Sequence, residues 1–147
     1  MTWLGGADAV FAVRLLHHAP KPQQVVSFLG SLSRPGGKII IISSVLAHLP
    51  RISSAPYNMA KAALEAMAKT AALELANHQI RVNVIQPGWI DTPGERKFAS
   101  EEALTRAGRR IPAGRLGTPE EIANSILFLC DRRNEYTTGA TLLVDGG

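Results

Sequence analysis

A run of four consecutive isoleucines, preceded by Lys38, constrains the fold of this chain more than any other feature. Gly36 and Gly37 come directly before it. β-branched apolar residues bounded by glycines predict a short strand, and the lack of polar alternation indicates that the strand is buried. Residues 38–42 are therefore expected to form a buried strand of an α/β protein. The composition, 46% hydrophobic and 19% charged, is ordinary for that class.

A long alanine-rich helix is predicted from Pro56 to about Asn77. Proline suits the first turn of a helix, and the interior is largely apolar, with a polar stripe of Lys61, Glu65 and Lys69. A helix that is apolar on most sides is buried on most sides. One face is expected to cover the sheet, and the small alanines let another subunit pack closely on the other. The alternative is a helix that its own chain alone covers.

Further strands and helices are predicted along the rest of the chain. The length of 147 residues is enough for one domain and too short for two. Three strands are visible in all. The remaining expected elements are a helix from Asp8 interrupted near residues 17–22, a helical piece from Gln23 to about Leu32, a strand from Ile80 to Ile85, a helix around residues 100–109, a helix capped by Thr118 that runs to about Asp131, and a strand from Ala140 to Val144.

Side chains suited to catalysis gather at the end of the first strand. Ser43 and Ser44 follow the isoleucine run, and Tyr57 and Lys61 lie at the start of the long helix. Because Tyr57 and Lys61 are four residues apart, their side chains share one helix face. Ligands of open α/β sheets bind at the carboxyl ends of the strands. A hydroxyl pair that faces a tyrosine and a lysine at this end predicts a catalytic site.

These residues resemble the motif of the short-chain dehydrogenase/reductase family, which is Tyr-x-x-x-Lys with a serine thirteen residues before the tyrosine. Ser44, rather than Ser43, stands thirteen residues before Tyr57. A lone Tyr-x-x-x-Lys is a weak signal, but several matching stretches in the right order make the resemblance specific. It covers roughly Val10 to the end of the chain, and its other stretches are residues 81–92, 115–123 and 145–147.

The resemblance implies the carboxyl-terminal portion of a Rossmann-like doubly wound parallel sheet, formed by one partial domain over residues 1–147. The family's first half supplies a Gly-rich turn, a helix whose amino terminus meets the pyrophosphate, and the residue that reads the adenosine ribose. Gly5-Gly6 follows no strand, and no Gly-x-Gly-x-x-Gly occurs in the sequence. The chain is therefore expected to lack the first dinucleotide-binding half.

The activity that the resemblance implies is hydride transfer between NAD or NADP and a small alcohol or carbonyl substrate. Tyr57 is implied as the general acid/base. Lys61 is implied to stabilise the Tyr57 phenolate and to hydrogen-bond the nicotinamide ribose, and Ser44 is implied to hold the substrate oxygen. Because the first half is not recognised, the chain alone is expected to bind either nucleotide weakly or not at all.

The resemblance also implies a nicotinamide contact after the second strand. Pro87 and Gly88 end that strand, and in the family the loop that follows approaches the nicotinamide ring. The backbone of Ile90 and the hydroxyl of Thr92 are implied to bind the carboxamide, which needs a donor and an acceptor in fixed positions. A bare turn is the alternative. Residues 93–115 correspond to the family's mobile substrate lid.

One departure from the family favours a different role. The family places an asparagine of the proton relay in the first helix, and the alignment puts Arg14 at that position. An arginine cannot accept a hydrogen bond and is always charged. Either the relay is altered or lost, or the register shifts by a few residues around the prolines. The rival hypothesis is a truncated, non-catalytic remnant that acts only as an oligomerisation or partner subunit.

Composition and charge exclude several other functions. The net charge is +4, and the basic pairs Arg109-Arg110 and Arg132-Arg133 are isolated, so no nucleic-acid partner is expected. No apolar stretch approaches transmembrane length and no secretory signal is visible, so a cytoplasmic location without membrane contact is expected. None of the four histidines has a cysteine, aspartate or glutamate at metal-ligand spacing, so no metal is expected. The expected partners are the small substrate and other copies of the chain, in a dimer or tetramer. The alanines expected at helix–helix contacts are Ala63, Ala66 or Ala71.

Overall fold

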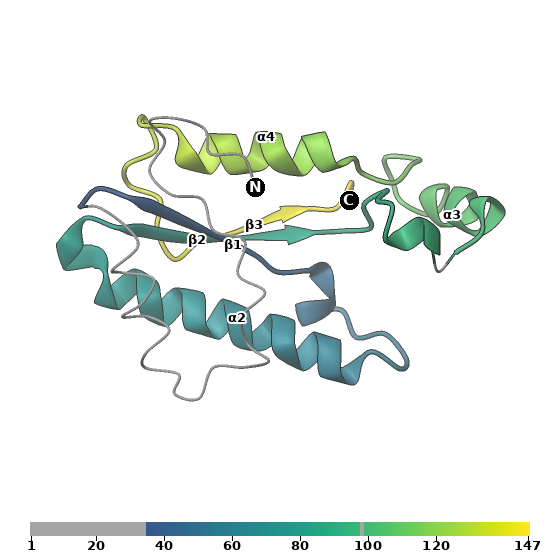
Figure 1. The fold of residues 1–147 in the computed structure, drawn as a ribbon, viewed down its shortest axis with the longest axis horizontal. Helices are drawn as coiled ribbons and strands as arrows, with labels where there is room; N and C mark the ends of the chain where they lie inside the picture. The colour runs from purple at the N-terminus through teal and green to yellow at the C-terminus, as the bar shows by residue number, and fades with distance from the viewer. Residues whose placement is uncertain (1–34, 98) are drawn as a thin grey trace.

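The computed structural model describes residues 35–97 and 99–147. Strands, α-helices and short 3-10 turns, labelled η, follow one another along these ranges (Figure 1). The helices expected before residue 35, and Arg14 with them, lie outside the described residues. The elements are β1 (Lys38–Ile42), η2 (Val45–Ala47), α2 (Ala55–Glu74), η3 (Ala76–His78), β2 (Arg81–Pro87), η4 (Glu95–Lys97), α3 (Glu101–Gly108), α4 (Pro119–Cys130) and β3 (Thr141–Val144).

The three strands form one parallel sheet in the order β1-β2-β3. Helix α2 covers one face of the sheet and α4 covers the other (Figure 1). The predicted mixed α/β fold with a parallel sheet is confirmed, and each strand lies where the sequence placed it. β2 continues beyond its predicted end to Pro87, because its pairing with β3 runs on to Val144.

The core lies on both faces of the sheet, which explains the unbroken isoleucine run. Successive side chains of a strand point to opposite faces. Ile39 and Ile41 pack with α2, while Ile40 packs with Leu129 of α4 on the other face. All three isoleucines are fully buried. A parallel strand covered on both faces needs apolar residues at successive positions, as found here.

Helix α2 is buried on one side only within the described residues. Leu64, Ala68 and Ala71 face the sheet and are buried. Ala71 is 0% exposed against this core, so its expected place at a contact between subunits is wrong. The opposite side exposes Met59 and Leu73. Whether another subunit covers that side stays a prediction.

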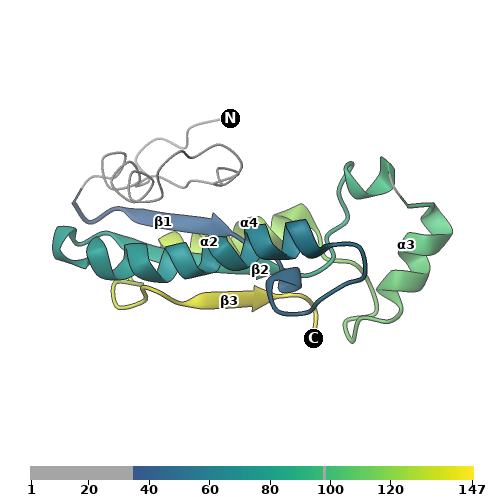
Figure 2. The ribbon, with the colours of Figure 1, turned by 90° about the horizontal axis from the view of Figure 1, so that it is seen from below.

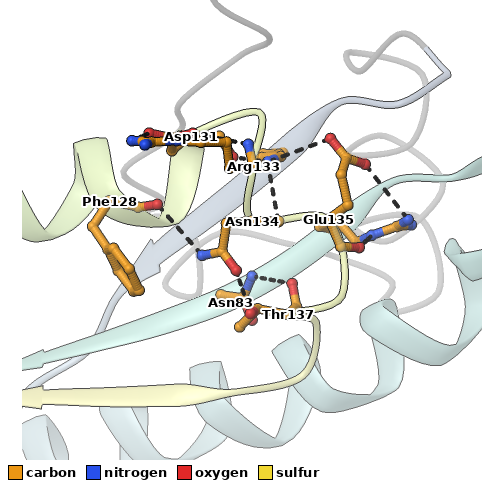
Figure 3. Close-up of polar contacts among 9 residues, drawn as sticks. Asn83, Phe128, Asp131, Arg133, Asn134, Glu135 and Thr137 are labelled. Atoms are coloured by element: carbon orange, nitrogen blue, oxygen red, sulfur yellow. Dashed lines mark hydrogen bonds and ion pairs between the residues drawn. The ribbon is translucent and has the colours of Figure 1, made fainter.

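Buried polar side chains of neighbouring strands fix the connection between α4 and β3 (Figure 3). The Asn83 amide donates to Thr137 O at 2.9 Å and accepts from Ala140 N at 3.1 Å. The Lys38 ammonium donates to Asp131 O at 2.5 Å. Lys38 begins β1 and Asn83 lies in the amino-terminal half of β2, whereas the predicted site residues lie at or beyond the carboxyl ends of these strands. They therefore hold the fold together without entering the site.

Replacing Asn83 with leucine should destabilise the fold by about 2–4 kcal/mol, because the Thr137 carbonyl and the Ala140 amide would lose their partners in a buried place. We expect the midpoint of urea unfolding to fall accordingly. Asn124→Leu is the matched control, since Asn124 is exposed on α4 and such surface changes stay within about 0.5 kcal/mol. Equal midpoints for the two variants would contradict this role of Asn83.

Candidate active site

Ser44 lies where the chain leaves β1, at the start of η2. Its Oγ caps this short turn by accepting from the Leu46 amide at 3.2 Å. The residue is 8% exposed, so its side chain is almost completely buried. Within the described residues the Ser44 O–H donates to no other group, so it remains able to donate to a ligand.

Tyr57 and Lys61 lie one turn apart near the amino end of α2, as their spacing predicts. The Lys61 Nζ is 5.5 Å from the centroid of the Tyr57 ring. It also donates to the carbonyl of Ile42, the last residue of β1, at 2.9 Å. The Tyr57 side chain is half-exposed, and its hydroxyl has no hydrogen-bond partner among the residues that the structure describes. Lys61 thus connects the first turn of α2, which carries Tyr57, to the end of β1, which Ser43 and Ser44 follow.

An open cleft of about 840 Å³ lies at the carboxyl ends of β1 and β2. Ser44 and Tyr57 line it from the side of η2 and α2. Gly88, Ile90 and Thr92 line it from the loop that follows β2. Most of the predicted site residues therefore meet around one hollow.

Lys61 and Pro87 are not among the residues that line this cleft. Lys61 reaches it through its contact with the Tyr57 ring. Pro87 ends β2 opposite Val144 of β3, and its part in cofactor binding stays a prediction.

Gly88 directs the loop across the end of β3. Its amide donates to Val144 O at 2.9 Å. A Cβ at this position would lie 2.6 Å from the Cβ of Asp145, closer than real side chains approach one another. Only glycine lets the two segments pass, so this residue is required by the close approach of the backbones.

Ile90 presents a backbone donor and acceptor that the described residues leave unused. The neighbouring groups pair with Gly117: Asp91 N donates to Gly117 O at 2.8 Å, and Gly117 N donates to Trp89 O at 3.0 Å. The Ile90 N–H and C=O themselves have no partner within residues 35–97 and 99–147. Such a pair matches the complementary donor and acceptor of a primary carboxamide.

Glu65 is a site residue that the sequence analysis missed. The sequence analysis assigned it only to the polar stripe of the long helix, but it is 4% exposed. Its carboxylate accepts from Ser43 Oγ at 2.5 Å and from Gln86 Nε2 at 2.7 Å, and it lies 2.7 Å from His48 Nε2. The sequence did contain one indication: Glu65 is four residues after Lys61, so both side chains lie on the same face of the helix.

The Glu65 cluster joins the elements that carry the site. Ser43 comes from the end of β1, Gln86 from β2 and His48 from the turn after η2. Burial raises the pKa of the Glu65 carboxyl, but the hydrogen bonds from Ser43, Gln86 and His48 outweigh it and hold the pKa below its usual value. The ionised Glu65 carboxylate therefore holds the carboxyl end of β1, next to Ser44, in place against α2.

Glu65→Gln should lower the free energy of unfolding by about 2–4 kcal/mol at neutral pH, because several hydrogen bonds to a charged acceptor are lost. The folded pKa is depressed, so this stabilisation is present above the unfolded value of about 4.3 and is lost as pH falls through the folded value. The difference between the two proteins should therefore shrink in acid.

Urea unfolding at neutral and at acidic pH measures this difference. Glu74→Gln is the control, since Glu74 is an exposed carboxylate on the same helix. A Glu65→Gln effect that is absent, or that is the same at both pH values, would contradict the charged role of Glu65.

The described part of the chain holds neither a metal site nor a bilayer-spanning helix. No three histidine, cysteine or acidic side chains within residues 35–97 and 99–147 are grouped so that they could bind a metal ion. In the same ranges, no helix combines the length and the apolar character that crossing a bilayer requires.

Comparisons with known proteins decide the family. Residues 22–147 match the family model described as enoyl-(acyl carrier protein) reductase. The 3-oxoacyl-(acyl-carrier-protein) reductase of Thermotoga maritima is 40% identical over 140 residues, 95% of this chain and 56% of that protein. Dehydrogenase/reductase SDR family member 4 of Homo sapiens is 40% identical over 115 residues, 78% of this chain and 41% of the human protein. The chain belongs to the short-chain dehydrogenase/reductase family.

Solved structures agree with this family membership. A blue fluorescent protein from a metagenomic library, in complex with NADPH, matches with a TM-score of 0.75 and 31% identity over 86% of this chain and 51% of that one. A short chain dehydrogenase family protein from Francisella tularensis matches with a TM-score of 0.75 and 28% identity, over 84% and 55%. The predicted resemblance and the partial Rossmann-like fold are confirmed. This short-chain dehydrogenase/reductase chain spans about half the length of the curated relatives it matches.

Proposed function

We propose that the chain carries the reacting part of an oxidoreductase that transfers hydride between NAD or NADP and a small alcohol or carbonyl compound. One observation carries the proposal: Ser44 and Tyr57 line the same cleft as Ile90 and Thr92. A substrate oxygen at the first pair and a nicotinamide carboxamide at the second would share one hollow. The proposal includes a cytoplasmic setting, since Cys130 is the single cysteine and no internal disulfide can form.

The side chains divide the work on the substrate oxygen. In reduction, Tyr57 donates its phenolic proton to the carbonyl oxygen, and in oxidation it takes the proton back. Ser44 donates a hydrogen bond to the same oxygen, since its O–H donates to no described residue while its Oγ accepts from the Leu46 amide. The Lys61 ammonium, 5.5 Å from the Tyr57 ring centroid, stabilises the negative charge that Tyr57 carries after proton transfer.

The residues after β2 fit a nicotinamide, which when bound supplies or accepts the hydride. The Ile90 amide can donate to the carboxamide oxygen, and the Ile90 carbonyl can accept from its NH₂ group, since the described residues use neither. The Thr92 Oγ1 accepts from the Glu95 amide at 3.3 Å, which leaves its proton to donate. The NADPH bound in the solved relative supports this class of cofactor.

A graft tests the proposal. Residues 35–147 would replace the matching part of the Thermotoga maritima reductase, which then supplies the amino-terminal half. We expect the graft to oxidise NADH or NADPH when a member of a panel of aldehydes and ketones is added, as followed by nicotinamide absorbance. The unaltered reductase, assayed beside it, sets the scale. A folded graft that binds NADPH and oxidises it with none of these carbonyls would remove the proposal.

A second role is favoured by the outer side of α2. Met59 and Leu73 are 71% and 79% exposed. They lie on one helix face with the exposed Ala63 and Ala66, at spacings of three, four and seven residues. Exposed apolar surface of this kind marks contacts between proteins. We propose that this side is buried in a homodimer or homotetramer. A truncated, non-catalytic subunit that acts only through this surface is the alternative to an enzyme.

Arginine at Ala63 or Ala66 should convert the oligomer to monomer or aggregate, because an unpaired charge in a buried contact is costly. Light scattering at micromolar concentration measures the mass. Ala76→Arg, at an exposed alanine just beyond α2, is the matched control and should leave the oligomer intact. A wild-type chain that is monomeric and melts cooperatively would contradict the proposal.

A further inference from the structure

A second hollow of about 490 Å³ adjoins the active-site cleft. The two share three lining residues, Arg51, Trp89 and Arg110. Besides these, the second hollow is lined by Arg106, Arg109 and two alanines of α3. Four of its seven lining residues are therefore arginines. We call these four, Arg51, Arg106, Arg109 and Arg110, the arginine cluster.

The arginine cluster has no protein counter-charge within residues 35–97 and 99–147. Arg96 and Arg115, by contrast, pair with Asp91 and Glu121, each at 2.7 Å. No ion pair or carboxylate hydrogen bond joins any member of the cluster to a described residue. The one acidic residue that lines either hollow is Glu95. Four positive charges minus one negative leave +3 around the joined space.

The parts of the cluster come from segments far apart in the sequence. Arg51 belongs to the loop before α2, and its guanidinium carbon lies 5.6 Å from the centroid of the Trp89 ring. Arg106 lies in α3, with Arg109 and Arg110 directly after it. Figure 2 shows α3 set apart from the sheet, beyond the end of β2. The negative end of the α3 helix dipole attracts arginines near the carboxyl end of that helix. It does not account for Arg51, which lies in a different segment.

Glu95 does not neutralise the cluster. Its carboxylate accepts the Trp89 indole N–H at 2.9 Å. It lines the active-site cleft and not the second hollow. Arg51 and Arg110 line both hollows, while Arg106 and Arg109 line only the second, which Ser44 and Tyr57 do not line. The cluster therefore extends from the cleft into the second hollow, where the far end of a substrate held by Ser44 and Tyr57 would lie.

We propose that the arginine cluster binds an anionic group, a carboxylate or a phosphate, at the far end of the substrate. The guanidinium group presents a planar fork of donors that matches both anions. All four arginines are exposed and are solvated by water when no ligand is bound. An anionic carbonyl compound gains charge-assisted hydrogen bonds to them that an uncharged one does not make, so the cluster favours anionic substrates. This inference deepens the proposed function, since it assigns a substrate class to the same site.

Anion binding can be measured without cofactor or turnover. In a Trp3→Phe background, Trp89 is the remaining tryptophan, and it lies between the two hollows. Inorganic phosphate and acetate would each be titrated at constant ionic strength, with Trp89 fluorescence as the readout. We expect a saturable change with at least one of them. Tighter binding of phosphate assigns a phosphate group to the substrate, and binding of acetate that is equal or tighter assigns a carboxylate.

Variants show whether the cluster is responsible. Arg106→Gln with Arg110→Gln should weaken binding by about tenfold or more, because charge-assisted hydrogen bonds are lost. Arg132→Gln removes the same charge from an exposed arginine just after α4, at the end away from α3 (Figure 1), and should leave binding unchanged. Circular dichroism checks that each variant folds.

The inference is overturned if neither anion gives a saturable change, or if Arg132→Gln weakens binding as much as the double variant does. The test also separates this inference from the proposed function. Anion binding together with an inactive graft would support the anion site and remove the oxidoreductase proposal. An active graft without anion binding would do the reverse.

Discussion

Tyr57→Phe should abolish nearly all turnover, by a factor of about 10² to 10⁴, in any polypeptide in which residues 35–147 reduce a carbonyl compound. Phenylalanine keeps the ring that faces the Lys61 Nζ at 5.5 Å and removes only the hydroxyl. Within the described residues that hydroxyl has no hydrogen-bond partner, so its loss should leave folding unchanged. The initial rate of NADH or NADPH oxidation then reports the proton transfer alone.

Tyr136→Phe is the matched control for this experiment. Tyr136 is the chain's other tyrosine and is fully exposed. Its variant should keep the parent rate. Lys61→Ala should reduce the rate and also raise the concentration of cofactor needed for half-saturation, because it removes the charge beside Tyr57. Retained turnover in Tyr57→Phe, with Ser44 intact, would end the proposed acid/base mechanism.

Elements that depend on local chemistry could be predicted from the sequence. Residues 38–42 form β1 with the predicted bounds. α4 begins as expected: the Thr118 hydroxyl accepts from the Glu121 amide, and the Glu121 carboxylate accepts from the Thr118 amide. Arg115 also binds this carboxylate, and with the capping bonds it lowers the pKa of Glu121 to about 2. A cap of this kind uses residues three apart, so the sequence alone contains it.

The end of α2 and its buried charge could not be predicted in the same way. The helix ends at Glu74, before the predicted Asn77, and a separate 3-10 turn follows. Glu65 looks like a solvated residue because its partners, Ser43, Gln86 and His48, come from elsewhere in the chain. A carboxylate is buried only where such partners meet it. That depends on tertiary structure, which helical periodicity does not report.

Part of the candidate site could likewise be predicted from the sequence, and part could not. The meeting of Ser44 and Tyr57 follows from topology, since one ends a strand and the other begins the helix packed beside it. The arginine cluster does not, because Arg51 and the arginines of α3 and its end come from segments far apart in the sequence that line one hollow with Trp89. The sequence analysis found Arg109-Arg110 to be an isolated basic pair, and both side chains are indeed exposed. Nothing local distinguishes this pair from Arg132-Arg133.

The isolated chain should bind NAD or NADP more weakly than millimolar. The described residues offer the carboxamide contacts of Ile90 and Thr92 and the Tyr57–Lys61 pair. The pyrophosphate is normally held by the amides of a Gly-rich turn and a helix amino terminus, and the sequence contains no Gly-x-Gly-x-x-Gly. Losing several charge-assisted hydrogen bonds, at ~1.5–3 kcal/mol each, removes several powers of ten in affinity.

Calorimetry on the chain and on its graft decides this prediction. The graft regains a first half from the Thermotoga maritima reductase and should bind NADPH in the micromolar range, while the chain alone should give no measurable heat. Because both share residues 35–147, the difference reports what the reductase's amino-terminal half contributes in place of residues 1–34. A low-micromolar dissociation constant for the chain alone would mean that residues 1–147 contain a cofactor site of their own, and the partial-domain interpretation would be wrong.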